Sequence, residues 1–180
     1  LIMFQYERDA QRVYEAIIKR MELFGLELSK EKTRILPFGR NCATRETFDF
    51  LGFTHFNSKT RKGYYTVGHK ISRKKKKQFK SNLKKWVKEN RNTQFDEFMK
   101  ALNKKLTGSF NYYSLSGMIR EVRSLWIHSL YVTFKWLNRR SQRRSFKLER
   151  FYEIWNDRII HPYIHVDIWS GDIVIYNKSV

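Results

Sequence analysis

The sequence predicts an α+β fold, in which a short antiparallel sheet with one packed helix is followed by an all-α, strongly basic domain. Three observations support this prediction. Apolar side chains alternate at residues 48–53 and 64–67, apolar side chains recur at helical spacing from residue 72 onward, and the charge shifts between the two regions. With 180 residues, the chain is long enough for one ordinary core or two small linked domains.

The positive charge is concentrated in the middle of the chain. Residues 1–57 carry 9 basic and 8 acidic side chains, whereas residues 58–160 carry 27 basic and 7 acidic ones, and the whole chain has a formal net charge of +20. A block of one sign repels itself unless a polyanion neutralises it. The charge therefore predicts a nucleic-acid partner for the central block.

Composition excludes several other classes of protein. The single cysteine, Cys42, excludes a disulfide framework and a multi-cysteine zinc site within the chain. No run of 18 apolar residues is present, and the opening LIMFQY is too short to be a signal peptide. We expect a reduced, intracellular compartment and no membrane partner.

The first region is expected to contain one helix and several strands. Ala10, Val13, Ile17, Met21 and Phe24 recur at helical spacing, and Gly25 is a natural stop. Four segments are interpreted as strands, namely residues 1–4, 34–38, 48–53 and 64–67. Asp49 alternates with buried Phe side chains and should be exposed, and the turn at residues 58–63 should join two strands in a hairpin.

The helix that begins at Ser72 is expected to be amphipathic. On a helical wheel Lys77, Lys80, Lys84 and Lys88 fall on one side, and Phe79, Leu83 and Trp86 fall on the opposite side. The lysines should therefore form one exposed face while the apolar side chains pack.

Three further helices and a tail complete the prediction. Thr93 and Asp96 fit a capping box for a helix with Phe95, Phe98, Met99, Leu102 and Leu106 turned inward. The next helix turns Ile119, Val122, Trp126, Leu130, Phe134 and Leu137 inward, and the last spans residues 146–157 with Phe151, Ile154 and Trp155 buried. The tail beyond Pro162 alternates and is either a strand or a loose extension.

Two basic clusters point to phosphate binding. Residues 73–91 hold ten Lys or Arg and only one acid, Glu89. Flexible lysines follow a polyanion without reading its sequence, although a solvated helix face is the alternative. The second cluster comprises Arg139, Arg140, Arg143 and Arg144, in which residues four apart would share a face if the helix continued.

Arginine favours forked contacts to phosphate or stacking on unpaired bases. The aromatic side chains Tyr112, Tyr113 and Trp136 are candidates to join it. The alternative is that Trp136 is a core residue and the arginines are generic surface.

The search for catalytic groups finds no complete site. His161 and His165 are four residues apart, but Pro162 between them argues against a helical metal pair. No glycine-rich phosphate loop, nucleophile elbow or acidic metal-binding cluster is present in the sequence. The residues alone predict a nucleic-acid-binding module without a complete active site.

Four segments, in their order and spacing, resemble the group II intron-encoded reverse transcriptase/maturase. They are FGLELSKEKTRIL (24–36), FDFLGF (48–53), NYYSLSG (111–117) and WLNRRSQRRSF (136–146), and the resemblance covers roughly residues 1–160. It implies that residues 1–70 are the C-terminal part of a polymerase palm, starting after the catalytic aspartate turn. Residues 72–160 would be the thumb, or maturase-specific domain X, and residues 161–180 a tail outside the resemblance.

The resemblance also implies roles for individual residues. Lys32 would lie near the incoming nucleotide as a proton donor, unless it is simply a turn lysine. Phe50, Leu51, Gly52 and Phe53 would form a primer grip, where Gly52 lets a backbone approach closely. The catalytic aspartates of the family are missing, so the chain is expected to be inactive alone and to hold no cofactor, with Mg²⁺ bound only by the complete polymerase.

The implied partners are group II intron RNA, an RNA/DNA template–primer and the missing N-terminal fingers and palm. The thumb would assist RNA splicing in the bacterial cytoplasm or an organelle and, in the complete protein, RNA-directed DNA synthesis. Two rivals remain open: a stand-alone basic RNA-binding protein without polymerase ancestry, and a DNA-binding recombinase fragment. The resemblance predicts exposed apolar surface in residues 1–70, whereas the stand-alone protein would show none.

Overall fold

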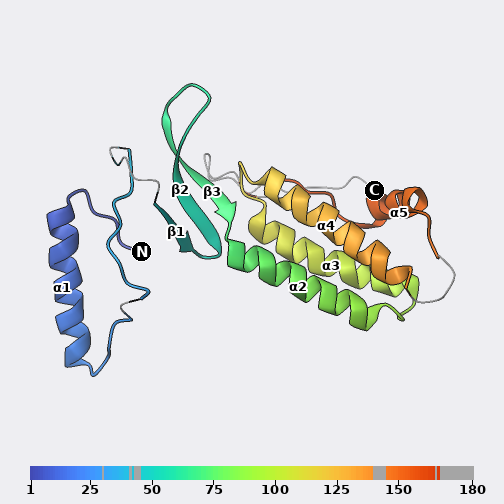
Figure 1. The fold of residues 1–180 in the computed structure, drawn as a ribbon, viewed down its shortest axis with the longest axis horizontal. Coiled ribbons are helices and arrows are strands. Elements are labelled where there is room, and N and C mark those ends of the chain that lie inside the picture. Colours follow the sequence, from blue (N-terminus) through green and yellow to red (C-terminus); the bar gives the residue numbers. More distant parts are fainter. Residues whose placement is uncertain (30, 41, 43–45, 140–144, 165, 167–180) are drawn as a thin grey trace. The chain divides into compact units, whose positions relative to one another are not determined.

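The structure, a computed structural model, describes residues 1–29, 31–40, 42, 46–139, 145–164 and 166 (Figure 1). Its elements, in chain order, are α1 (Glu7–Leu23), β1 (Thr47–Phe50), β2 (Phe53–Lys59), β3 (Tyr65–Ile71), α2 (Arg73–Asn90), α3 (Phe95–Tyr113), α4 (Ile119–Leu137) and α5 (Leu148–Arg158). The predicted α+β class is confirmed. Within the described part of the chain, no helix has both the length and the apolar character needed to cross a membrane.

The chain divides into two compact units. The first unit comprises Leu1–Phe48 and Phe56–Val67, and the second comprises Asp49–His55 and Gly68–Val180. The three strands form one antiparallel sheet in the order β1-β2-β3. The boundary between the units therefore passes through the strands.

Helix α1 in the first unit forms where the apolar spacing predicts it. Gly25, just past its end, has φ +67°, a left-handed conformation that glycine adopts without steric cost. Ala10, in the first turn, is the one buried residue of the helix. At its other end, Leu23 and the C-cap residue Phe24 are exposed. Helix α1 thus has an amphipathic sequence but little core of its own.

Two predicted strands of the first unit are wrong. Residues 1–4 are exposed, with Met3 87% accessible, and none of the described segments pairs with them. A short apolar run forms a strand only where a neighbouring strand satisfies its backbone. Residues 34–38 are held beside β1 by side chains instead: Arg34 donates to the Thr47 carbonyl at 3.2 Å, and the Phe38 and Phe48 rings lie 5.0 Å apart.

The prediction of one strand over residues 48–53 is also wrong, because the chain turns within it. Leu51 and Gly52 have φ +48° and +82°, so they form the two-residue loop between β1 and β2. Positive φ at both loop residues matches the right-handed twist of a hairpin. The second hairpin, β2–β3, is confirmed, and its turn is closed by Thr60 N–H donating to the Tyr64 carbonyl at 2.8 Å.

The core of the second unit is built from helices. It includes Leu83 and Val87 of α2, five residues each of α3 and α4, and Phe53 and Ile71 of the sheet. Ser72 caps α2 through its hydroxyl, which accepts from the Lys75 amide at 3.4 Å. The predicted capping box is wrong: Gln94 is the N-cap of α3 and makes no side-chain cap hydrogen bond, and α3 continues beyond Gly108 to Tyr113.

Helices α2 and α4 run parallel, and α3 runs antiparallel to α2. Lys76 and Glu121, each near the start of its helix, form an ion pair at 2.5 Å, and Lys88 lies 5.8 Å from the Trp136 ring near both helix ends. Trp86 near the end of α2 contacts Phe98 near the start of α3 at 5.3 Å. The C-terminal ends of α2 and α4 consequently lie together.

Helix α5 and the chain after it close the helical core. Phe151 and Trp155 are buried as predicted, Ile154 is half-buried, and α5 begins two residues later than predicted, at Leu148. The Trp126 ring nitrogen donates to the Ile160 carbonyl at 3.0 Å, and Ile160 N–H donates to Asn103 at 2.8 Å. Val166 forms a parallel bridge with Leu115, and the rest of the tail beyond it lies outside the described residues.

Replacing Gly52 by Ala is expected to lower the free energy of unfolding by about 1–2 kcal/mol, because a left-handed conformation is costly for a residue with a Cβ. Chemical denaturation measures the change. Gly108→Ala is the control, because Gly108 lies inside α3 with open space around it and alanine is the better helix former. The assignment of the turn is contradicted if both variants shift stability in the same direction.

Two histidines face each other across β2 and β3. His55 Nδ1 and His69 Nδ1 lie 2.9 Å apart, a distance at which one ring donates its proton and the other accepts. Burial, together with the charge of His55, lowers the pKa of His69. On α4, burial and the nearby Lys80 lower the pKa of His128. Both sites thus favour neutral imidazole in the folded state.

Acidification is therefore expected to destabilise the fold. A group whose folded-state pKa is depressed contributes stability above its unfolded pKa of 6.5, and this is lost as the pH falls through the lower folded value. Denaturant midpoints at pH 7.5 and 5.0 measure the loss. The double variant His69→Gln/His128→Gln should show a smaller drop, and an equal drop would contradict the role of these two groups.

Candidate nucleic-acid interface

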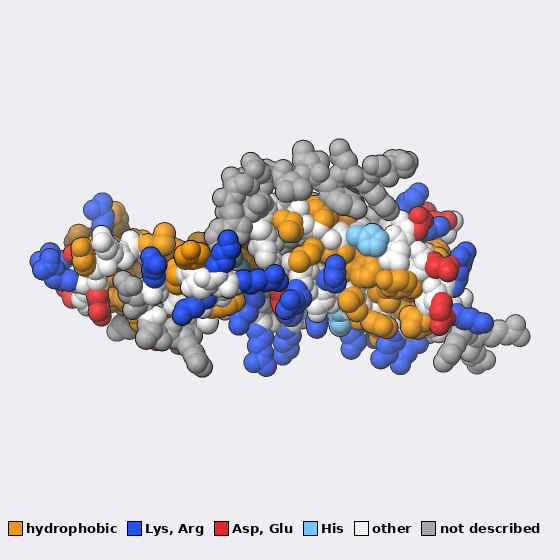
Figure 2. Space-filling view, turned by 90° about the horizontal axis from the view of Figure 1, so that it is seen from above, with side chains coloured by type: hydrophobic (Ala, Val, Ile, Leu, Met, Phe, Trp, Pro, Cys, Tyr) orange, Lys and Arg blue, Asp and Glu red, His pale blue; other side chains and the backbone are white. Residues whose placement is uncertain are grey.

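Helix α2 presents the basic face that its sequence predicts. Lys77, Lys84 and Lys88 are exposed and Lys80 is half-exposed, whereas Leu83 and Val87 are buried and Phe79 and Trp86 pack against the core. Figure 2 shows Lys and Arg side chains along one edge of the second unit. The first turn of α2 holds no acid, although acidic side chains are favoured there. The charge at the start of this helix is therefore not arranged for helix stability.

Lys76 differs from the other lysines of α2. Its ion pair with Glu121 is about 30% exposed on each side and joins the first turns of α2 and α4. This lysine belongs to the packing between the helices, and its charge is neutralised within the chain.

The two basic clusters of the sequence meet at Trp136. Lys88 and Arg91, at the end of α2, lie 5.8 and 5.6 Å from the centre of its ring, and Arg139, just past α4, lies 5.3 Å from it. We call Lys88, Arg91, Arg139 and Trp136 the Trp136 cluster. It is built by the parallel arrangement of α2 and α4, which places residues 48 positions apart in the chain against one ring.

Two kinds of favourable interaction hold the three cations beside the Trp136 ring. Each cation–π contact contributes about 0.5–1 kcal/mol at an exposed site, and helix C-termini carry partial negative charge. These terms oppose the mutual repulsion of three like charges. The ion pairs found within the described part of the chain involve none of these three residues. A bound anion would remove the remaining repulsion, so the cluster is suited to phosphate.

Helix α4 ends at Leu137, before the arginine pairs, so the shared faces that a continuing helix would give do not extend from α4 to Arg139. Asn138 is its C-cap and forms two hydrogen bonds with the backbone of Phe146, donating to the carbonyl at 3.1 Å and accepting from the amide at 2.9 Å. These bonds join the two ends of the connection that carries the arginine pairs. Arg140, Arg143 and Arg144 lie outside the described residues.

The two candidate base-stacking tyrosines pack against the sheet. The Tyr112 hydroxyl donates to the Leu51 carbonyl at 2.5 Å, and the rings of Tyr112 and Tyr113 each lie 5.6 Å from Phe53. Burial and the neighbouring Tyr112 raise the pKa of Tyr113. Both side chains lie at the junction of α3 with the β1–β2 turn, and Tyr112 remains half-exposed there.

The proposed primer-grip residues lie at that same turn. Phe50 and Leu51 are exposed, Gly52 forms the turn, and Phe53 is buried in the core. Asp49 is exposed as predicted and accepts from the Thr54 hydroxyl at 2.5 Å. Lys32 is exposed in a turn of the first unit, where its amide donates to the Ser29 carbonyl at 3.1 Å. The structure brings none of the other candidate residues to Lys32 by a described contact.

Sequence reasoning counted Arg91 in the basic cluster of residues 73–91 without singling it out, and it missed the central position of Trp136. No local pattern marks them, because their association depends on the register between α2 and α4. The available signal was position in the sequence, since Arg91 is the last residue of the first basic cluster and Trp136 lies just before the arginine pairs.

Comparison of the sequence and structure with protein-family models, curated proteins and solved structures gave no match. Among the described residues, no group of three or more His, Cys, Asp and Glu side chains is placed to hold a metal ion.

The Lys76–Glu121 ion pair allows a stability test that distinguishes lysines that pack between helices from lysines that are free to bind a ligand. Lys76→Gln is expected to lower the free energy of unfolding by about 1 kcal/mol, because it leaves a half-buried carboxylate without its partner. Lys77→Gln, one position away and exposed, should leave stability unchanged or raise it slightly by reducing repulsion. Equal losses in the two variants, measured by denaturation, would contradict this division of the basic face.

Proposed function

We propose that this chain binds structured RNA through α2 and the Trp136 cluster, and that it is the C-terminal part of a group II intron reverse transcriptase/maturase. In this proposal the second unit acts as the thumb, gripping intron RNA and template–primer. The binding energy favours the RNA conformation that splices. The RNA performs the splicing chemistry, and the protein contributes binding.

The observation that carries the proposal is the Trp136 cluster. Three cations from two helices gather on one ring without an ion-pair partner among the described residues. An ordinary solvated helix face carries charges of both signs, and its folding does not require like charges from another helix to lie beside them. Arginine and tryptophan together provide both phosphate hydrogen bonds and a stacking surface, the combination that suits RNA with unpaired bases.

The first unit supports the resemblance over a self-sufficient RNA-binding protein. Its exposed apolar side chains include Leu1, Ile2, Met3, Leu23, Phe24 and Leu26. Apolar surface of this kind marks a contact with another protein surface. In the proposal that surface meets the fingers and the remainder of the palm.

Two smaller assignments belong to the same proposal. The exposed Phe50 and Leu51 at the β1–β2 turn would contact the primer, and Lys32 would approach an incoming nucleotide. No step of the proposal passes through Mg²⁺. The chain is proposed as a binding unit and not as a polymerase on its own.

Binding to a folded group II intron RNA should exceed binding to duplex DNA of equal charge at 150 mM salt. Changing Lys88, Arg91 and Arg139 together to Gln should remove most of this preference and reduce the slope of log affinity against log salt by about 2–3. Changing Arg139, Arg140, Arg143 and Arg144 to Ala tests the second basic cluster. Filter binding or fluorescence anisotropy measures both effects.

The matched control changes Arg12, Lys19 and Arg20 of α1 to Gln, which removes the same charge from exposed positions of the first unit. This control should keep the preference for RNA. If both triple variants lose affinity equally, or if RNA and DNA bind alike in the wild type, the chain has only a generic basic surface and the proposal fails.

A further inference from the structure

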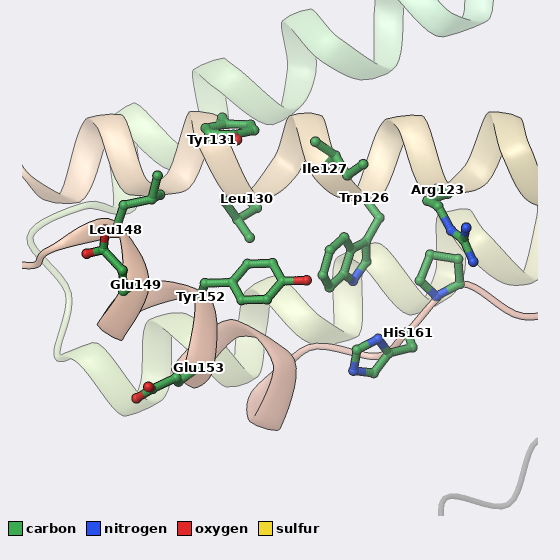
Figure 3. A pocket seen from close by; sticks show the side chains of 11 residues that line it. Arg123, Trp126, Ile127, Leu130, Tyr131, Leu148, Glu149, Tyr152, Glu153 and His161 are labelled. Carbon is green, nitrogen blue, oxygen red and sulfur yellow. The ribbon is translucent and has the colours of Figure 1, made fainter.

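A groove of about 850 Å³ lies between α4 and α5, within the second unit (Figure 3). Its floor and walls are largely apolar and aromatic, formed by Trp126, Leu130 and Tyr131 from α4 and by Leu148 and Tyr152 from α5. The segment after α5 closes one side with His161 and Pro162. Neither the basic clusters nor the resemblance assigns a role to this groove. Its volume lies within the range of ligand-binding pockets.

Aromatic rings in the groove are accessible. Tyr131 is 55% exposed and Tyr152 is 48% exposed, one from each wall. Trp126 is buried in the groove, with the His161 ring stacked on it at 5.5 Å and the Tyr152 ring meeting it edge-on at 6.3 Å. The Tyr152 ring is therefore held in place by Trp126, and both exposed tyrosines are available to a flat ligand.

The charged side chains lie at opposite ends of the groove. Arg123 is at one end, and Glu149 and Glu153 are at the other, as Figure 3 shows. Glu153 is paired with Arg150 at 2.8 Å, whereas the described ion pairs do not include Glu149. The groove thus has a cation at one end, an apolar aromatic middle and carboxylate acceptors at the other end.

We infer that this groove binds an unpaired nucleobase of the RNA, an inference that rests on the proposed function. The base stacks on one of the two exposed tyrosine rings, Tyr131 or Tyr152, Arg123 contacts a neighbouring phosphate, and a carboxylate accepts from an amino or imino group on the base edge. A duplex backbone does not suit the groove, because its phosphates would meet Glu149 and Glu153. An unpaired base has apolar faces and a polar edge, which match the order of groups along the groove.

A protein segment is the rival occupant of an apolar groove. The base is favoured because α4 also supplies Trp136 to the phosphate-binding cluster, so one helix would engage both the backbone and a base of the same strand. The net charge of +20 also favours an anionic partner.

The test compares a 12-nucleotide oligoadenylate with an RNA backbone of equal length that lacks its bases. The wild type should bind the intact strand about 5- to 150-fold more tightly, the range for one stacked base. Tyr131→Ala/Tyr152→Ala should lose most of that difference while keeping its affinity for the abasic strand. Tyr131→Phe/Tyr152→Phe should keep the difference, because the rings and not the hydroxyls carry the stacking.

The control is Tyr6→Ala/Tyr64→Ala, which removes two exposed tyrosines from the first unit and should change nothing. Photo-crosslinking of the wild type to RNA containing 5-iodouridine needs no variant and should label Tyr131 or Tyr152. Equal loss on intact and abasic strands in the Ala variant, or crosslinks only elsewhere, overturns the inference and leaves the groove to a protein segment.

The same measurement separates this inference from the proposed function. Changing Lys88, Arg91 and Arg139 to Gln should weaken intact and abasic strands alike, because it removes phosphate contacts only. If that loss occurs but the base-dependent difference is absent, the groove inference fails and the proposed RNA binding stands. If neither appears, the proposed function fails with it.

Discussion

The parallel packing of α2 against α4 is the arrangement on which the rest of the second unit depends. Burial of Leu83 and Val87 on one helix, and of Val122, Leu125 and Leu130 on the other, contributes to a core that α3 and α5 complete. Removing such side chains from water is the dominant favourable term in folding. This burial offsets the repulsion that follows when two helices bring their basic C-terminal ends together.

Helix α4 organises both candidate binding features of the unit. Its side chains at Arg123, Ile127 and Tyr131 line the groove, and Trp136 at its last turn holds the three cations. Its inner face is fixed by the core, so these groups are held by a rigid element and not by loops. The first unit differs, because α1 buries only Ala10 and keeps several large apolar side chains exposed.

The exposed and buried faces of a helix could be predicted from the sequence wherever its apolar side chains follow the helical period. The lysine face of α2 and the buried faces of α3 and α4 follow from the 3.6-residue period alone. Prediction failed where a contact distant in sequence decides the outcome. Residues 1–4 lack a pairing strand in the described structure, and Leu51 is a rare residue at positive φ, so nothing local announced the turn. The Trp136 cluster depends on the register between α2 and α4, and so the meeting of Arg91 with Trp136 was not foreseen.

The two hydrogen bonds between Asn138 and Phe146 join the ends of the connection between α4 and α5. They use one amide side chain and the main chain of Phe146, so the closure does not depend on which side chains lie between. The entropic cost of bringing the two ends of this connection together depends mainly on its length and little on its composition. Substitutions in the connection between α4 and α5 therefore change the charge that it carries, while the two hydrogen bonds and the helical core stay as they are.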